Sequence, residues 1–219
     1  MRAEEAVRLQ KAFDTVRRYG RRENRAERCA LCGQGIGEPH PHLLELSARR
    51  LVCACESCAV LCRLRSNATY KEIPQRVTVL EDFAITDAQW DGLMIPIGMA
   101  FLFRNSQAGR MVCIYPGPGG ATESLLPLEF WQDIASGNAA LANMEADVEA
   151  LLVNRLGANR GFPEAAYYLL PIDQCYRLVG LMRTHWRGLS GGSEVWQRLS
   201  EYFAELRERA LSSVGRAYA

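Results

Sequence analysis

Cys29-Ala-Leu-Cys32-Gly33, His40-Pro-His42 and Cys53-Ala-Cys55-Glu-Ser-Cys58 are the segments around which the chain is organised. With Cys62 just beyond, they hold six of the eight cysteines of the 219-residue chain. Two Cys-x-x-Cys pairs about twenty residues apart can bring four thiolates to one tetrahedral metal ion, because each pair forms a tight turn with two sulfurs. The window therefore predicts a small metal-binding module of the zinc-ribbon or rubredoxin-like kind.

Six thiols compete for four positions at such an ion. Cys29 and Cys32 form the first predicted pair, and Gly33 supplies the backbone freedom that the tight turn needs. Cys55 and Cys58 form the second pair, because they have the same two-residue separation. The remaining two thiols are predicted to be neighbours of the site: Cys53 in a hairpin, and Cys62 on the following turn.

Four thiolates bind either zinc or iron, so the ligand set does not identify the metal. Zinc would give a closed structural site, and iron a one-electron carrier. Neither offers an open coordination position for hydrolysis. His40 and His42 lie between the two pairs, where they are loop residues, donors to the thiolates, or parts of a second site.

Charge and targeting signals limit the functional classes. The charges of the 26 basic and 25 acidic side chains nearly cancel, which argues against binding of nucleic acid through the overall charge of the protein. Met1-Arg-Ala-Glu-Glu lacks the apolar segment of a signal peptide, and no apolar run is long enough to span a bilayer. We therefore expect a cytoplasmic protein, where clustered thiols more often bind metal than form disulfides, the competing interpretation.

Periodicity predicts an α+β protein with three parts. An N-terminal helix within residues 1–25 has an apolar stripe and a basic Arg17–Arg25 cluster. The metal module covers residues 26–66 and contains a small hairpin, followed by a short helix near Cys58–Cys62. Residues 70–219 form a mixed domain with a small antiparallel sheet and a helical C-terminal part.

Within the third part the predicted strands are 75–83, 98–103, 110–115 and 167–170. The predicted helices are a turn capped by Thr86 or Asp87, then 128–135, 141–156, one from Asp173 to Trp186, and a last helix after Gly188–Gly192. The segment 116–124 is predicted to be a loop.

Few residues outside the cysteine window suggest a catalytic or binding role. Cys113 is predicted to be a core residue, and His185 to have a packing role. The acidic residues Glu145, Asp147 and Glu149 are predicted to lie on a solvated helix face. The 116–124 loop lacks the Gly-Lys-Ser/Thr ending of a nucleotide-phosphate loop, and the chain has no nucleophile elbow and no His-Glu-x-x-His motif. No catalytic residue is therefore assigned.

Further segments accompany the cysteines and histidines quoted above: Ala121–Pro127, Val148–Val153, Cys175–Gly180 and Trp186–Gly192. Together they resemble a family encoded beside actinobacterial-type, oxygen-tolerant [NiFe] hydrogenases. The resemblance implies an accessory role in assembly, maturation or electron transfer, with a hydrogenase subunit or assembly factor as the partner.

Three functional hypotheses follow. The first is a non-enzymatic hydrogenase accessory protein with a structural zinc ion. The second is a rubredoxin-type carrier with iron at the same cysteines. The third, which the balanced charge disfavours, is a zinc-ribbon adaptor for nucleic acid that uses the Arg17–Arg25 cluster. The 117–124 and 188–192 loops are the expected partner surfaces.

Overall fold

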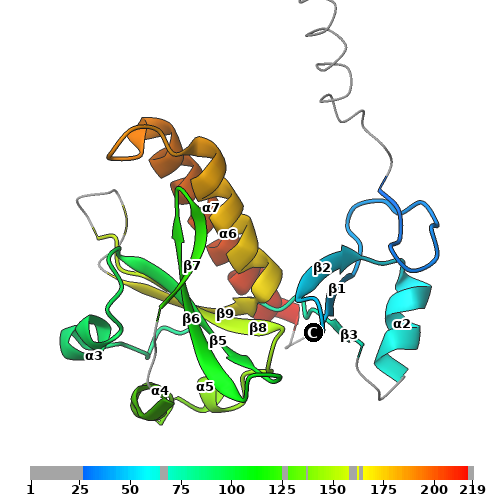
Figure 1. The fold of residues 1–219 in the computed structure, drawn as a ribbon, viewed down its shortest axis with the longest axis horizontal. Helices are drawn as coiled ribbons and strands as arrows, with labels where there is room; N and C mark the ends of the chain where they lie inside the picture. The colour runs from blue at the N-terminus through cyan, green and yellow to red at the C-terminus, as the bar shows by residue number, and fades with distance from the viewer. Residues whose placement is uncertain are drawn as a thin grey trace, which may run out of the picture.

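A computed structural model describes residues 27–64, 69–124, 128–136, 138–157, 162 and 165–216 of the chain. It confirms the α+β class, with two antiparallel sheets of strand order β2-β1-β3 and β4-β9-β8-β5-β6-β7. Figure 1 shows the smaller sheet with α2 beside the larger sheet with the other helices. The predicted helix within residues 1–25 and the Arg17–Arg25 cluster lie outside the described residues.

The smaller sheet, with α2, forms the module. Its elements are β1 (His42–Glu45), β2 (Arg50–Cys53), α2 (Glu56–Leu64) and β3 (Tyr70–Glu72). β1 pairs with β2 in the predicted hairpin, with Leu43 opposite Val52. The predicted short helix is confirmed as α2, although it begins earlier than expected. β3 was not predicted, because only three residues pair with β1 and none of them is buried.

The larger sheet has six strands. They are β4 (Thr78–Val79), β5 (Met99–Asn105), β6 (Arg110–Gly117), β7 (Gly120–Ser124), β8 (Glu149–Asn154) and β9 (Ala166–Pro171). β5 and β6 form the predicted hairpin, in which Phe101 lies opposite Ile114 and Leu102 opposite Cys113. β9 confirms the predicted strand at 167–170.

Within the described residues, five helices accompany this sheet: α3 (Asp87–Gly92), α4 (Leu128–Ala135), α5 (Ala139–Ala142), α6 (Ile172–His185) and α7 (Gly192–Arg216). α3 starts as predicted at Thr86, whose hydroxyl accepts the Gln89 N–H while the Gln89 side chain accepts the Thr86 N–H. α4 and α7 also match their predictions. Among the described helices, none has the length and apolar character to cross a membrane.

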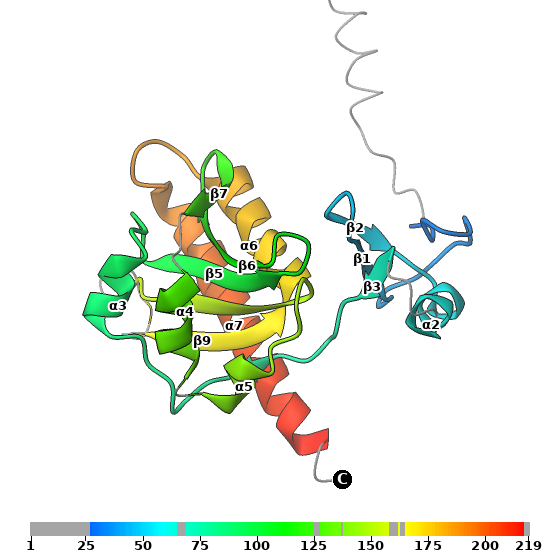
Figure 2. The same cartoon turned by 60° about the horizontal axis from the view of Figure 1, so that its bottom comes forward.

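Helices cover both faces of the larger sheet. Phe101 and Phe103 on one face pack with residues of α6 and α7 in one core. Leu102 and Cys113, on the other face, pack with residues of α4 and α5 in a second core. Figure 2 shows α3, α4 and α5 in front of the sheet and α6 and α7 behind it. The sheet is thus a middle layer, and the prediction that Cys113 is a core residue is confirmed.

The prediction of one helix from Leu141 to Leu156 is wrong. α5 ends at Ala142, and the second half of the segment is β8, in which every residue is buried. A strand covered on both faces is apolar at nearly every position, so a short segment of it also satisfies helical spacing. The apolar residues that suggested one helix face belong instead to both faces of a strand.

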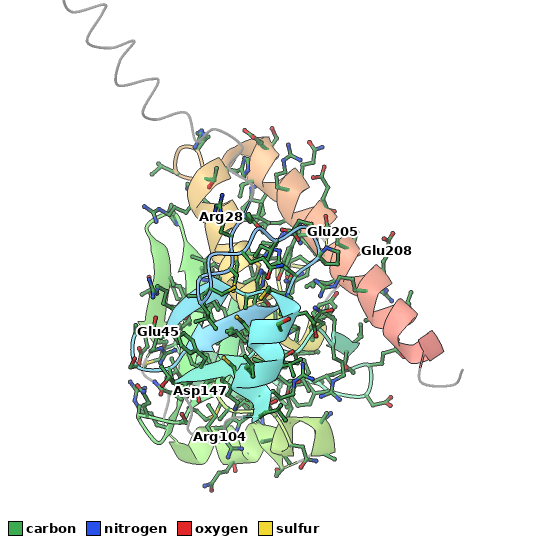
Figure 3. All side chains as sticks on the ribbon, turned by 90° about the vertical axis from the view of Figure 1, so that its right-hand side faces the viewer. Arg28, Glu45, Arg104, Asp147, Glu205 and Glu208 are labelled. Carbon is green, nitrogen blue, oxygen red and sulfur yellow. The ribbon has the colours of Figure 1, made fainter. Side chains whose placement is uncertain are left out.

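Two of the three acidic residues around the start of β8 differ from the prediction for the same reason. Asp147 and Glu149 are buried, so their assignment to a solvated helix face is wrong, whereas Glu145 is exposed as predicted. The Asp147 carboxylate accepts the Ser106 N–H at 2.9 Å. Glu149 accepts the Glu145 N–H at 2.9 Å and pairs with Arg76 at 3.1 Å. These carboxylates therefore fix the turn that leads into β8 (Asp147 is labelled in Figure 3).

Two further strand boundaries differ from the prediction. The segment 116–124 is not a loop: β6 runs to Gly117, and after a two-residue turn the chain returns as β7. The glycines and prolines expected of a loop instead form a tight hairpin turn, in which Gly120 takes a φ of 116°. The strand predicted at 75–83 is reduced to β4, because only Thr78 and Val79 pair with β9.

The connection between the two sheets is buried at both of its ends, with Gln75 and Arg76 exposed between them. Ile73 and Val77 are 4% and 1% exposed, and both belong to the core beneath α6 and α7. Leu44 of the module belongs to the same core. The module is therefore joined to the larger sheet by apolar packing as well as by the chain.

We expect Gly98→Ala to destabilise the fold by about 1–3 kcal/mol, as overpacking does. A Cβ at Gly98 would lie 2.8 Å from the Arg155 carbonyl oxygen, which is backbone and cannot move aside as a side chain can. Denaturant unfolding measures the loss. The matched control is Gly180→Ala on α6, where a Cβ meets no atom within 4 Å. This control should be stabilised by about 0.5–1 kcal/mol. Equal effects at both positions would contradict the prediction.

Candidate metal centre

The structure brings together the four cysteines that the spacing selects. The sulfurs of Cys29, Cys32, Cys55 and Cys58 all lie within 4.8 Å of one another. Cys32 Sγ and Cys55 Sγ are 3.7 Å apart. Two sulfurs bound to one tetrahedral ion at a zinc–sulfur distance of about 2.3 Å are separated by about 3.8 Å. The cluster can therefore hold a metal ion with little rearrangement.

The first pair lies on a tight turn closed by its own backbone. The Gly33 N–H donates to the Cys29 carbonyl, and the Cys29 N–H donates to the Gln34 carbonyl, both at 2.8 Å. Gly33 has a φ of 77°, a left-handed conformation that glycine adopts at no steric cost. The predicted role of Gly33 in the turn is confirmed. The turn presents Cys32 at the surface and Cys29 in the interior.

The second pair lies at the start of α2. Cys55 precedes the first helical residue, and its carbonyl accepts the Ala59 N–H at 3.0 Å. Cys58 follows in the first turn. The Ala30 N–H donates to the Cys53 carbonyl at 2.8 Å and ties the first turn to the end of β2.

The thiols influence one another's charge. Burial acts to raise the pKa of Cys29, but backbone hydrogen bonds from Cys55, Cys32 and Leu31 outweigh it and lower the pKa to about 6. Hydrogen bonds with the Cys55 and Cys32 thiols raise the pKa of Cys58 to about 12. Without a cation, therefore, the thiols cannot all ionise together. A divalent ion among them would offset half of the charge of four thiolates.

The apolar interior of the module is small. Its buried residues are Leu43, Val52, Ala54 and Ala59, together with the ligand candidates Cys29 and Cys55. Two of the four apolar side chains are alanines, which bury little surface. A metal ion held by the four cysteines would add much to the stability of a module with so small a core.

The module contacts the larger domain through polar groups as well. His42 Nδ1 lies 2.7 Å from the Asp173 carboxylate at the start of α6. Lys71 on β3 donates to the Ala146 carbonyl at 2.7 Å and pairs with Glu145 at 3.0 Å. Figure 3 views the module from its outer side, with α2 in front of the larger domain.

Asp173 does not cap α6 as predicted. The residue before the first helical position is Pro171, and no side chain caps the helix. Asp173 lies in the first turn, where a negative charge is favoured, and its carboxylate reaches across to His42. This hydrogen bond raises the pKa of His42 above its usual value. Sequence spacing could not reveal this contact, because 131 positions separate the two residues.

Cys53 and Cys62 lie outside the four-cysteine cluster, as the spacing predicts. Cys53 instead forms a separate group with His40 and His42, whose candidate ligand atoms also lie within 4.8 Å of one another. Cys62 is half-buried on α2. His185 joins the end of α6 to α7 by contacting Glu194 at 2.8 Å.

A comparison with protein families matches residues 28–210 to a family of unknown function, DUF5947. This match covers most of the chain. The chain belongs to this family. The matched DUF5947 segment begins just before Cys29 and ends on α7, so it includes both the cysteine module and the larger sheet. No curated protein and no solved structure matches the chain.

Proposed function

We propose that this DUF5947 protein is a non-enzymatic accessory protein of a [NiFe] hydrogenase, with a structural zinc ion at the four-cysteine centre. The observation that carries the zinc assignment is the closed group of four sulfurs. Four protein ligands saturate a tetrahedral ion and leave no position for a substrate. Because the apolar core of the module is small, such an ion would stabilise the fold of the module.

The hydrogenase partner rests on the resemblance of the segments quoted in the sequence analysis. The proposed role is assembly, maturation or partnering, through contact with a hydrogenase subunit or an assembly factor. Leu44 and His42 attach the module to the larger domain, so the module presents a fixed surface for that contact.

The outer side of α2 is the surface that we assign to the partner. Leu61 and Leu64 are 54% and 74% exposed, and Val60 is partly exposed beside them. Exposed apolar side chains that cluster on one helix are typical of protein-binding surfaces. The Gly188–Gly192 segment between α6 and α7 is a second candidate for the partner surface, and its Leu189 is fully exposed. The segment 117–124 is less suited, because most of it is strand β7.

Affinity capture from the native host tests this function. The tagged full-length protein is expected to recover hydrogenase subunits or an assembly factor. Leu61→Glu combined with Leu64→Glu should lower that recovery at least about tenfold, the effect of losing roughly 1.4 kcal/mol of binding.

The matched control for this experiment is Leu211→Glu, which changes a 67% exposed leucine on α7. It should capture the partner as well as the unmodified protein does. Equal recovery with the α2 variant would exclude α2 as the surface. Unchanged hydrogenase activity and cofactor content after gene deletion would contradict the accessory function itself.

One observation favours an iron electron carrier as the second candidate. Cys32 is exposed, so one ligand of the centre reaches the surface, where an electron can enter. Backbone hydrogen bonds to the Cys29 sulfur are of the kind that tune the potential of an iron site. Metal analysis and the absorption spectrum of protein from the native host decide between the two. A colourless protein with stoichiometric zinc excludes the carrier.

A further inference from the structure

His40, His42 and Cys53 gather at one end of the β1–β2 hairpin, apart from the four-cysteine centre. His42 lies directly opposite Cys53 in the register of the two strands. Residues that are directly opposite in an antiparallel pair place their side chains on the same face of the sheet. The His40 ring lies edge-on to the His42 ring, with 5.1 Å between centroids. The candidate ligand atoms of all three residues lie within 4.8 Å of one another.

We propose that this group is a second metal site, which binds Zn²⁺ or a similar divalent metal ion through His40, His42 and Cys53. Imidazole nitrogen and thiolate sulfur are the donors that such ions prefer. The site goes beyond the structural zinc proposed above, and it does not depend on the hydrogenase assignment.

The orientation of His42 supports the proposal. Its Nδ1–H donates to the Asp173 carboxylate at 2.7 Å, which leaves Nε2 as the nitrogen with a free lone pair. Metal-binding histidines almost always donate their other ring N–H to a carboxylate, a carbonyl or water, which fixes the tautomer and the ring. Asp173 thus acts as a positioning residue for the His42 ligand.

His40 provides an independent observation. Its side chain is only 4% exposed, and its Nδ1 lies 3.1 Å from the Gly37 carbonyl, to which it donates. The remaining nitrogen, Nε2, is buried and makes no hydrogen bond. Leaving a buried polar atom without a partner costs about 1–3 kcal/mol. A metal ion bound at Nε2 would remove that cost.

The surrounding charge favours a cation at this site. Glu27 Oε2 lies 3.4 Å from His40 Nε2, and Glu38 Oε1 lies 3.7 Å from His40 Nδ1. Glu27 and Glu38 group with His40 but not with His42 and Cys53, so their carboxylates add negative charge beside the ion and the fourth position is left to water. Glu27 is more than half exposed, so water has access to this side of the site. We therefore expect this ion to exchange more easily than one held by four thiolates.

Metal stoichiometry of the full-length protein tests the site. Zn²⁺ is added in excess, weakly bound metal is removed by gel filtration, and metal per chain is measured by mass spectrometry. We expect two ions in the unmodified protein, and one ion in both Cys53→Ser and His42→Gln. Asp173→Asn should retain the second site with about ten- to a hundred-fold weaker affinity, because it removes the carboxylate behind His42 and none of the three proposed ligands.

Cys62→Ser is the matched control, because Cys62 is a half-buried cysteine of the same module that belongs to neither group. It should still bind two ions. Co²⁺ provides a second readout, since its thiolate bands at the four-cysteine centre report a folded module in each variant. One ion in the unmodified protein, or two ions in both Cys53→Ser and His42→Gln, would overturn the proposal.

Discussion

Cys55→Ser is expected to abolish metal binding at the four-cysteine centre and to unfold the module around it. Serine is nearly isosteric with cysteine and is a good residue at the start of a helix, so the substitution preserves the capping position before α2. What it removes is one of four thiolates. Structural zinc sites contribute roughly 10–16 kcal/mol of apparent binding free energy, which the small module core cannot replace.

Hydrogen exchange measures this effect segment by segment. The amides of β1 and β2 should lose their protection, whereas those of β5 and β8 in the larger sheet should keep theirs. Metal analysis should show both ions lost, because the proposed second site lies on the same β1–β2 hairpin. Cys62→Ser again serves as the control and should leave both measurements unchanged. If Cys55→Ser kept its metal and its protected hairpin, the four-cysteine centre would not be what stabilises the module.

Phe101→Ala is expected to have the largest effect on the larger domain. Phe101 is fully buried on β5, and its ring lies 6.3 Å from that of Phe103 and 5.8 Å from that of Tyr176 on α6. Truncating a buried phenylalanine costs about 3–5 kcal/mol through lost contacts and the cavity that remains. For a chain of this size, the melting temperature should fall by about 6–20 °C.

The control variants for Phe101→Ala separate cavity formation from a general effect of mutation. Phe101→Leu retains most of the volume and should cost less than the alanine variant. Met94→Ala, at a position 68% exposed, should change stability by no more than about 0.5 kcal/mol. The metal content of folded Phe101→Ala should equal that of the unmodified protein, because Phe101 lies in a different core from the cysteines. A loss below about 1 kcal/mol would contradict the assigned packing.

The sequence was most informative where the local pattern and the final environment agree. The four cysteines come together because the two-residue spacing of each pair is itself a local geometry, and Gly33 takes the backbone conformation expected of it. Thr86 begins α3 for a similarly local reason. The β5–β6 hairpin was predictable because two apolar segments flank a short polar turn.

The sequence was least informative where distant parts of the chain determine the environment. β8 is buried on both faces by helices that come before and after it in the chain. No pattern within the β8 segment itself indicates that these helices pack on it. Asp147 and Glu149 are buried for the same reason, and their partners Ser106 and Arg76 lie far away in sequence. The contact between Asp173 and His42, which supports the proposed second metal site, is visible only in the tertiary structure.

The burial of Ile73 and Val77, at the two ends of the connection between the sheets, has a practical consequence for dividing the gene. Domain boundaries usually fall in exposed linkers, where a protease can cut and a truncated clone stays soluble. Here both side chains are inserted into the core beneath α6 and α7, close to Leu44 of the module. A clone that begins after Val77 would open a hole in that core, and one that ends before Ile73 would lose the surface that shelters Leu44. The cysteine module and the larger domain are therefore best expressed and studied as a single piece.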